Sequence, residues 1–281
     1  MEQKTQPVLC CLCGDEYSDP TQFVMERLFT SANLDWKVIT AQIQSESIEE
    51  AIAGIQALRL SAIRFGQPFE TAGQSSFLNE IPDVAFVGAI SAALDEGDNW
   101  TGWHSFGPAL VELLGSSVDW SSCTVLLCGD SIQQRSSILP LLEKTPVKLL
   151  WLEAGESEQA LKTWLERSGT SLDQPVLFTD TDQLPSGLGS ASESSEQIVV
   201  IEPSQVVLGA LANAEPENWD KIAVWDPSES LPKELTGLAS FQAISLQSLN
   251  IAIDEYDFRR WTGAEPNRSL LVDAHEEYCS F

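Results

Sequence analysis

Short apolar runs alternate with stretches of helical periodicity along the first hundred residues. The runs are rich in β-branched residues and are too short for helices, so we interpret them as buried strands. Strand and helix in this rhythm predict a parallel or mixed sheet with helices on its faces. The expected strands are Pro7 to Cys13, Trp36 to Ile43, Leu60 to Phe65 and Val84 to Ala89.

Two helices are predicted between these strands. Pro20 opens the first, because proline is tolerated in the first turn of a helix. Ser47 and Glu50 form a capping-box-like start for the second. The apolar positions at helical spacing are Phe23, Val24, Leu28 and Phe29 in the first helix, and Ile48, Ile52, Ile55 and Leu58 in the second.

A second series of alternating elements begins near Trp103 and has the pattern of a doubly wound nucleotide-binding half. We therefore expect a two-lobed α/β fold: an N-terminal mixed-sheet lobe of residues 1–103 plus 246–281, and a Rossmann-like lobe of residues 104–245. The expected elements are a helix from about Ser105 to Leu114, the strand Cys123 to Cys128, then Gly129 and a helix through Leu142, the strand Val147 to Leu152, a helix around Leu161, Trp164 and Leu165, the short runs Val176 to Thr179, Ile198 to Ile201 and Ile222 to Trp225, a surface loop from Pro185 to Gln197, and a last amphipathic helix from roughly Leu246 to Trp261.

Composition restricts the class of protein. Hydrophobic residues make up 43% and charged residues 20%, which is enough to bury a core. No apolar stretch approaches the roughly 20 residues of a membrane-spanning helix, and the first run, from Pro7 to Cys13, is too short for a signal peptide, so a cytoplasmic location is expected. The formal charge of −27 repels phosphate backbones and anionic lipid, so we expect neither nucleic acid nor membrane as a partner.

The cysteines and histidines do not have the spacing of a metal site. Cys10, Cys11 and Cys13 lie in one apolar run with no second cysteine pair at zinc-ligand spacing, and the two histidines, His104 and His275, are isolated. We expect free, buried thiols and no metal.

Three stretches occur in an order and spacing that resemble the shikimate dehydrogenase family. They are Arg64-Phe65-Gly66-Gln67-Pro68-Phe69-Glu70, then Gly97-Asp98-Asn99-Trp100-Thr101-Gly102, and the strand, glycine and helix unit from Cys123 to Leu142 with Arg135 in its first turn. The family has Asn-Val-Thr-x-Pro-x-Lys, Gly-Asp-Asn-Thr-Asp-Gly and Gly-x-Gly-Gly-x-x-Arg at these places. Tyr17-Ser18-Asp19-Pro20 and Trp261-x-Gly263 extend the resemblance, which runs from about Leu9 to Gly263 and is weakest between Glu153 and Ile198.

The resemblance implies that most of the family's functional side chains have changed. The catalytic lysine falls on Glu70, and its partner aspartate falls on Thr101. The substrate-binding positions fall on Tyr17, Asp19, Arg64, Gly66, Ser91 and Ile253. Threonine does not titrate in the required range, and carboxylates at positions 19 and 70 oppose an anionic substrate, so the changes predict lost dehydrogenase activity.

The family's cofactor loop has changed in the same direction. Glycines let the backbone approach a pyrophosphate, but here Gly129 is followed by Asp130, Ser131 and Ile132. After the next strand the family has an Asn-Arg-Thr segment whose arginine pairs with the NADP ribose phosphate, and this sequence has Trp151-Leu152-Glu153 instead. Glu153 could accept hydrogen bonds from an NAD ribose, but a lone acidic residue after a strand is more often a solvated loop carboxylate. We therefore expect no cofactor, or NAD or NADP if activity is retained.

Arg64 leaves two interpretations open. It could hold the carboxylate of a small-molecule ligand in a cleft between the lobes. It could instead pair with Glu70 or Asp19 and close an empty cleft, which we favour. His104 is expected to cap or pack rather than catalyse.

These observations predict a shikimate dehydrogenase-like protein without dehydrogenase activity, retained as a small-molecule binding or interaction protein. One alternative is an active NAD(P)-dependent oxidoreductase of altered specificity that uses Glu70 as base. Another is a structural partner acting through its acidic surface. The sequence leaves the oligomeric state open.

Overall fold

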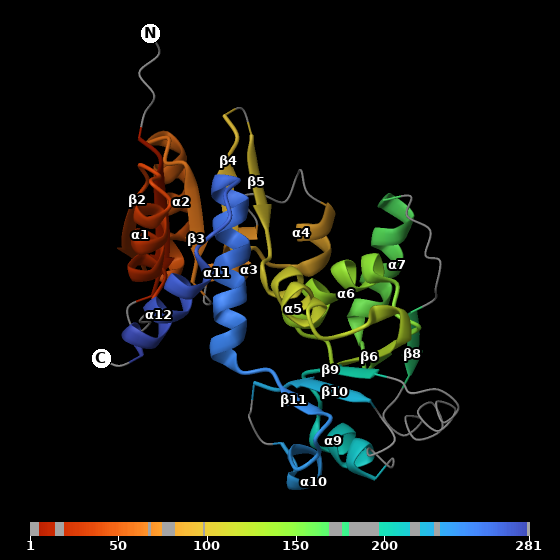
Figure 1. Cartoon of the computed structure of the whole chain (residues 1–281). Coiled ribbons are helices and arrows are strands. Elements are labelled where there is room, and N and C mark those ends of the chain that lie inside the picture. Colours follow the sequence, from red (N-terminus) through yellow and green to blue (C-terminus); the bar gives the residue numbers. More distant parts are fainter. Residues whose placement is uncertain are drawn as a thin grey trace. The chain divides into compact units, whose positions relative to one another are not determined.

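The chain folds into two compact units in the computed structural model (Figure 1). One unit contains Met1–Ala109 and Asn250–Phe281, and the other contains Leu110–Leu249. The sequence-based boundaries lie a few residues away, at 103/104 and 245/246. The structure describes residues 6–14, 20–66, 69–74, 82–97, 99–168, 176–179, 197–213, 220–227 and 231–279.

The first unit is built on a five-stranded mixed sheet with strand order β2-β1-β3-β4-β5. The first three strands are parallel, while β4 runs antiparallel to both β3 and β5. Its elements are β1 (Val8–Cys13), α1 (Thr21–Ser31), β2 (Lys37–Gln42), α2 (Ile48–Ala57), β3 (Ala62–Phe65), α3 (Glu70–Gln74), α4 (Pro82–Val87), β4 (Ala92–Asp95), β5 (Trp100–Trp103) and α12 (Arg268–Tyr278), with α5 (Phe106–Gly115) and α11 (Leu246–Thr262) crossing the unit boundaries.

The strand β1 forms because its side chains are apolar on both faces, as in a sheet covered on both sides. Cys10 and Leu12 pack into one cluster with the isoleucines of α2. Leu9 and Cys11 pack into another with residues of α1, α11 and α12. Five of the cysteines are buried, as expected, and Cys279 is exposed. No group of three potential metal ligands occurs among the described residues.

Three local predictions in this unit are wrong. Val84 to Ala89 is not a strand: it lies in α4 and the turn after it, and the strand begins at Ala92, because Gly88 adopts a φ of +79° that ends the helix. Ser47 does not cap α2 with its side chain, since a 3-10 turn over Ser45–Ser47 leads into that helix. Leu58 is 73% exposed, while the isoleucine stripe of α2 is buried as predicted.

The second unit is a doubly wound parallel sheet with strand order β11-β10-β9-β6-β7-β8. From β6 the chain adds β7 and β8 on one side of β6, and it then adds β9, β10 and β11 on the other side. The strand order therefore reverses between β6 and β9. This confirms the Rossmann-like prediction. The elements are β6 (Cys123–Cys128), α6 (Ile132–Lys144), β7 (Lys148–Leu152), α7 (Glu156–Ser168), β8 (Val176–Thr179), β9 (Gln197–Ile201), α9 (Gln205–Ala212), β10 (Lys221–Trp225), α10 (Lys233–Thr236) and β11 (Phe241–Ala243).

The predicted loop from Pro185 to Gln197 lies outside the described residues, apart from Gln197 at the start of β9. The predicted last helix is followed by a further one, α12, which begins at an Asn267 N-cap. Among the described helices, none has both the length and the hydropathy needed to cross a membrane.

Candidate functional site

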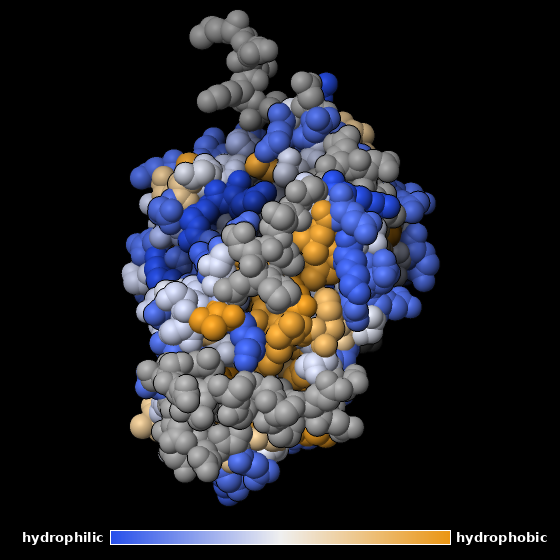
Figure 2. Space-filling model, turned by 90° about the vertical axis from the view of Figure 1, so that its right-hand side faces the viewer, coloured by the Kyte–Doolittle hydropathy of each residue, from blue (hydrophilic) through white to orange (hydrophobic). Residues whose placement is uncertain are grey.

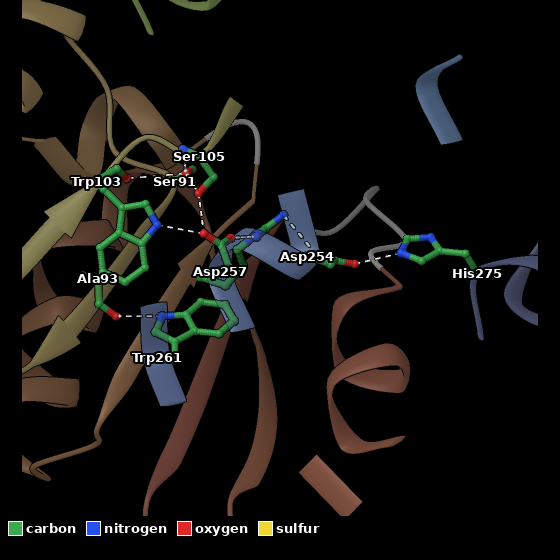
Figure 3. Close-up of polar contacts among 9 residues, drawn as sticks. Ser91, Ala93, Trp103, Ser105, Asp254, Asp257, Trp261 and His275 are labelled. Atoms are coloured by element: carbon green, nitrogen blue, oxygen red, sulfur yellow. Dashed lines mark hydrogen bonds and ion pairs between the residues drawn. The ribbon is translucent and has the colours of Figure 1, made fainter. Parts of the chain in front are cut away.

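A buried charge network joins β3 to α11 in the first unit (Figure 3). Arg64 donates through Nη1 to Asp257 Oδ2, and its Nη2 lies 3.6 Å from Asp254 Oδ1. The Arg64 side chain is 15% exposed, while those of Asp257 and Asp254 are 0% and 4% exposed. Charges this deeply buried are retained only where they are paired and hydrogen-bonded.

Asp257 is the centre of the network. Besides Arg64, it accepts hydrogen bonds from Trp103 Nε1 at 2.7 Å and from Ser105 Oγ. Ser91 Oγ lies 2.8 Å from Ser105 Oγ and also accepts from the Ser105 backbone N–H. Strands β3 and β5, the segment before β4 and the helix α11 are thereby tied to one carboxylate.

The network continues from Asp254 to the last helix. His275 Nε2 lies 2.8 Å from Asp254 Oδ2, and both side chains are 4% exposed. Asp254 therefore lies between a guanidinium and an imidazole, and it links α12 to α11.

A carboxylate and an imidazole lie beside this network. Glu70 opens α3, and its Oε2 is 3.7 Å from Nε2 of the buried His104. The Glu70 carbonyl accepts from the N–H of Ile90, the neighbour of Ser91, which places the pair next to the network. A carboxylate and an imidazole in such proximity can exchange a proton with a ligand hydroxyl.

The structure brings some of the predicted site residues together and separates others. Arg64 and Ser91 belong to the network, and Glu70 lies beside it. Thr101 donates to Glu96 Oε2 at 2.8 Å instead. Tyr17 and Asp19 lie outside the described residues.

Two expectations about this region are wrong. The resemblance implies that Gly97 to Gly102 joins the two series of elements, but Trp100 to Gly102 lie in β5, which pairs antiparallel with β4 inside the first sheet. Arg64 is ion-paired as favoured, but with Asp257 and Asp254 rather than with Glu70 or Asp19, since α11 carries two carboxylates spaced three residues apart on one face.

Sequence reasoning missed Asp254 and Asp257, and it gave His104 only a packing role. Gly102 and Gly107 have the same spacing as Gly97 and Gly102, five residues further on, where the chain passes from β5 into α5. The repeated spacing allows a second alignment of the family's Gly-Asp-Asn-Thr-Asp-Gly motif, with His104 inside the motif. The sequence does not decide between the two alignments, because nothing local distinguishes a hairpin from a connection to the next helix.

The second unit carries its candidate site at the carboxyl edge of the sheet, where β6, β7 and β9 end side by side. Gly129 follows β6 with a φ of +96°, a conformation that favours glycine. Asp130, Glu153 and Glu202 are carboxylates in the loops that leave these three strands.

Asp130 is bonded to the start of α7. Its carboxylate accepts from the backbone N–H of Glu156 at 3.1 Å and from Ser157 Oγ, and Arg135 Nε lies 3.1 Å away. A carboxylate at a helix N-terminus satisfies exposed N–H groups and complements the helix dipole. Asp130 thus fills one anion-binding position with a side chain of the protein itself.

The start of α6 is also satisfied internally. Ser131 and Gln134 form a capping box, in which the Ser131 N–H donates to Gln134 Oε1 at 2.9 Å and Ser131 Oγ accepts from the Gln134 N–H. Ser131 Oγ also contacts Glu202 Oε2 at 2.6 Å. The N–H of Ser131 and the N–H of Gln134 are therefore not available to a phosphate.

The thiol of Cys128, at the end of β6, is buried close to two of these carboxylates. Burial, with added repulsion from Glu153 and Glu202, raises the pKa of Cys128 to about 12. A fold of this type implies a dinucleotide whose pyrophosphate approaches the first strand-to-helix turn. The residues present do not fit that group, because Asp130, Glu153 and Glu202 lie at the turn and the N–H groups of Gly129, Ser131 and Gln134 have acceptors within the protein.

No protein-family model matches the chain. It is 24% identical over 258 residues to the shikimate dehydrogenase (NADP(+)) of Bacillus subtilis strain 168, which covers 85% of this chain and 87% of that protein. Its fold is similar to that of shikimate 5-dehydrogenase from Listeria monocytogenes, solved with shikimate and NAD (TM-score 0.72, 14% identity, 99% and 97% of the two chains). It is equally similar to 5-ketofructose reductase of Gluconobacter sp. strain CHM43 (TM-score 0.72, 12% identity, 98% and 99%).

Proposed function

We propose that this chain, a member of the shikimate dehydrogenase family, has lost NAD(P)-dependent dehydrogenase activity and binds a small molecule through its first unit. The observation that carries the proposal is the position of Asp130. Hydride transfer in this family needs a nicotinamide cofactor, and the proteins of similar fold include ones solved with NADP+ or with NAD. A carboxylate bonded at the turn where a pyrophosphate would lie opposes that cofactor by charge.

The first unit supports the same proposal. Glu70 stands where the resemblance puts the catalytic lysine, and it faces His104 instead of a carboxylate partner. Where the resemblance implies a lysine and an aspartate, the chain has Glu70 and Thr101, and the neighbour of Glu70 is His104, which changes the charge presented to a substrate.

A direct test measures cofactor binding and turnover separately. We expect no saturable quenching of tryptophan fluorescence by NADPH, NADP or NAD, and no NADP-dependent oxidation of shikimate. A shikimate dehydrogenase active in the same buffer serves as the positive control. Saturable binding of any of these dinucleotides would contradict the proposal.

The second candidate function is an oxidoreductase of altered specificity, and the Glu70–His104 pair is the observation that favours it. Such a pair can act as a general base toward a hydroxyl group. The test is a screen of hydroxy acids and polyols with NAD and NADP. Turnover that disappears in Glu70→Gln, while Thr101→Val retains it, would establish this candidate in place of the first.

A further inference from the structure

We infer that β2 pairs antiparallel with β2 of a second copy of this chain, about a two-fold axis perpendicular to the first sheet. The inference concerns a surface of the first unit and is independent of the proposed function. It follows from an open sheet edge whose two ends carry opposite charges.

The backbone of β2 has one side open to further pairing. β2 lies at the edge of the first sheet (Figure 1), and among the described strands only β1 pairs with it. The Lys37 N–H donates to the carbonyl of Pro7, on the side of β1. Because the backbone groups of successive residues in a parallel ladder point to alternate sides, the N–H and C=O groups of Val38 and Thr40 are directed away from β1.

This edge has few of the features that block further pairing. β2 has six residues, contains no proline and pairs with β1 in one uninterrupted register, so it has no bulge. Its only charged residue is Lys37, at the first position, and the other five positions are uncharged. Edge strands are commonly protected by proline, bulges, short length or charges along the strand. The edge of β2 is therefore a template for another strand.

The surface beside the edge is apolar on the side that α2 covers. Ile39 is the register partner of Cys10, so it lies on the same face as the α2 cluster, and it is 43% exposed. The sequence has no acidic residue from position 36 to 45 or from 51 to 69, although the chain has 42 of them. Two copies with a charge of −27 repel each other, so contact between them is favoured where carboxylates are absent.

The symmetry of such a pair restricts its register. Hydrogen-bonded positions must face each other, so Thr40 lies opposite Val38 or Thr40 of the second copy. Ile39 then faces Ile39 or Ala41 of that copy, and apolar surface that is exposed in one chain is covered. Because the axis is perpendicular to the sheet, the α2 helices of both copies lie on the same side and run antiparallel.

Opposite charges at the two ends of this surface favour a second copy as the occupant. Lys37 opens β2, and Arg59 lies in the turn before β3, at the same end of these parallel strands. Asp35 adds one carboxylate there. The other end carries three exposed glutamates, in the turn after β2 and in the first turn of α2: Glu46, Glu49 and Glu50. Antiparallel pairing brings the cationic end of one copy to the acidic end of the other, whereas parallel pairing would bring like charges together.

Sedimentation velocity of the full chain, over about 1 to 200 μM, measures the association. We expect a dimer with a Kd of about 10 μM or lower, typical of a small interface. Ile39→Lys places like charges near each other across the axis and should weaken the dimer about tenfold or more. The matched control is Leu177→Lys, on the edge strand β8 of the second unit, where the leucine is 44% exposed; it should leave the Kd unchanged.

Thr40→Pro tests the role of the backbone. The substitution removes an N–H that is directed away from β1, which an edge strand tolerates, so the chain should fold while the dimer weakens about tenfold or more. Circular dichroism confirms folding of each variant.

A charge exchange tests the antiparallel arrangement. Lys37→Glu should weaken the dimer about threefold or more, because the new carboxylate meets the acidic end of the second copy. Adding Glu46→Lys in the same chain should restore the Kd of the wild-type protein, since the two positions approach each other only across an antiparallel pair.

A monomer over the whole concentration range would overturn the inference and leave this edge to a strand of a different protein. A dimer that Leu177→Lys weakens and Ile39→Lys does not would overturn it by placing the contact in the second unit. An unchanged Kd in the folded Thr40→Pro variant, or no recovery in the charge-exchanged variant, would also overturn it. None of these results bears on dinucleotide binding, so failure of this inference is distinguishable from failure of the proposed function.

Discussion

Gly66, directly after β3, is a residue whose identity is fixed by a close backbone approach. A Cβ at this position would lie 2.8 Å from the carbonyl oxygen of Leu12, which also accepts the Gly66 N–H. Because the obstacle is backbone in the middle of the first sheet, no side-chain rotation relieves it. Gly54, in the middle of α2, has no atom within 4 Å of the equivalent position.

The two glycines therefore predict opposite effects of the same substitution. Gly66→Ala should lower the free energy of unfolding by about 1–3 kcal/mol through overpacking. Gly54→Ala should raise it by about 0.5–1 kcal/mol, because alanine loses less conformational entropy in a helix. Urea unfolding of both variants checks the pair, and a stable Gly66→Ala protein would show that β1 and this turn are not held together as described.

The buried thiols predict a loss of stability at alkaline pH. Burial raises the pKa of Cys10 to about 11 and that of Cys128 to about 12, from an ordinary value of 9.0. In the unfolded chain these thiols ionise near pH 9. Above that pH, folding therefore requires each thiolate to take up a proton. Their contribution is complete below pH 9 and is lost as pH rises toward the folded-state values, at up to about 1.4 kcal/mol per pH unit for each thiol.

Urea unfolding between about pH 8 and pH 10.5 measures this slope. Cys128→Ala should reduce the slope, although it lowers stability at neutral pH by removing a buried side chain. Cys279→Ala removes an exposed thiol and should leave the slope unchanged. Equal slopes in the wild-type and Cys128→Ala proteins would mean that Cys128 ionises in the folded state as readily as in the unfolded one.

At the scale of whole elements, carboxylates connect helices to neighbouring elements in both units. Asp254 connects α12 to α11 through His275, and Asp257 connects α11 to the sheet. In the second unit, Asp130 connects the turn after β6 to the first turn of α7. Each carboxylate satisfies donors that belong to another element, so its loss should loosen one helix before it affects the rest of its unit.

Asp130→Ala should accordingly destabilise the start of α7. We expect a loss of about 1–2 kcal/mol, as for removal of a helix cap, and faster hydrogen exchange of the Glu156 amide. The control is Glu158→Gln on the same helix, which breaks an exposed pair with Lys162 and should change stability by less than about 0.5 kcal/mol. Unchanged exchange at Glu156 would show that Asp130 does not hold α7.

At the scale of the whole molecule, the dominant property is negative charge. The sequence has 42 acidic against 15 basic residues, and hydrophilic side chains cover broad areas of the face in Figure 2. Ion pairs do form, such as Arg27 with Glu277, but 15 basic residues cannot neutralise 42 acidic ones. Like charges on a compact surface repel one another, and this repulsion is relieved when the chain expands.

Salt should therefore stabilise the protein. We expect NaCl to raise Tm by about 3 °C or more, with most of the rise at low concentration, because the screening length falls to about 8 Å by 0.15 M. Differential scanning fluorimetry over an NaCl series measures the rise, and choline chloride at equal ionic strength should reproduce it. A Tm that is independent of salt would show that the acidic groups do not repel one another in the folded state.

The sequence by itself determined the class of fold and most of its elements. Apolar runs of five or six residues became strands such as β1 and β6, because burial on both faces is encoded locally in their side chains. The order of degenerate motifs indicated the resemblance to the shikimate dehydrogenases, and the sequence alone showed Asp130 in the turn after β6. These features depend on neighbours in the chain, which a sequence displays directly.

Only the tertiary structure decided which charges meet. Arg64 and Asp257 are 193 residues apart, and nothing local to either selects the other. The same apolar composition also allowed a strand at Val84, where the fold forms α4 and starts β4 eight residues later. Long-range pairing and the choice between helix and strand in short apolar segments depend on what packs against them, so they are settled by the assembled core and not by the residues themselves.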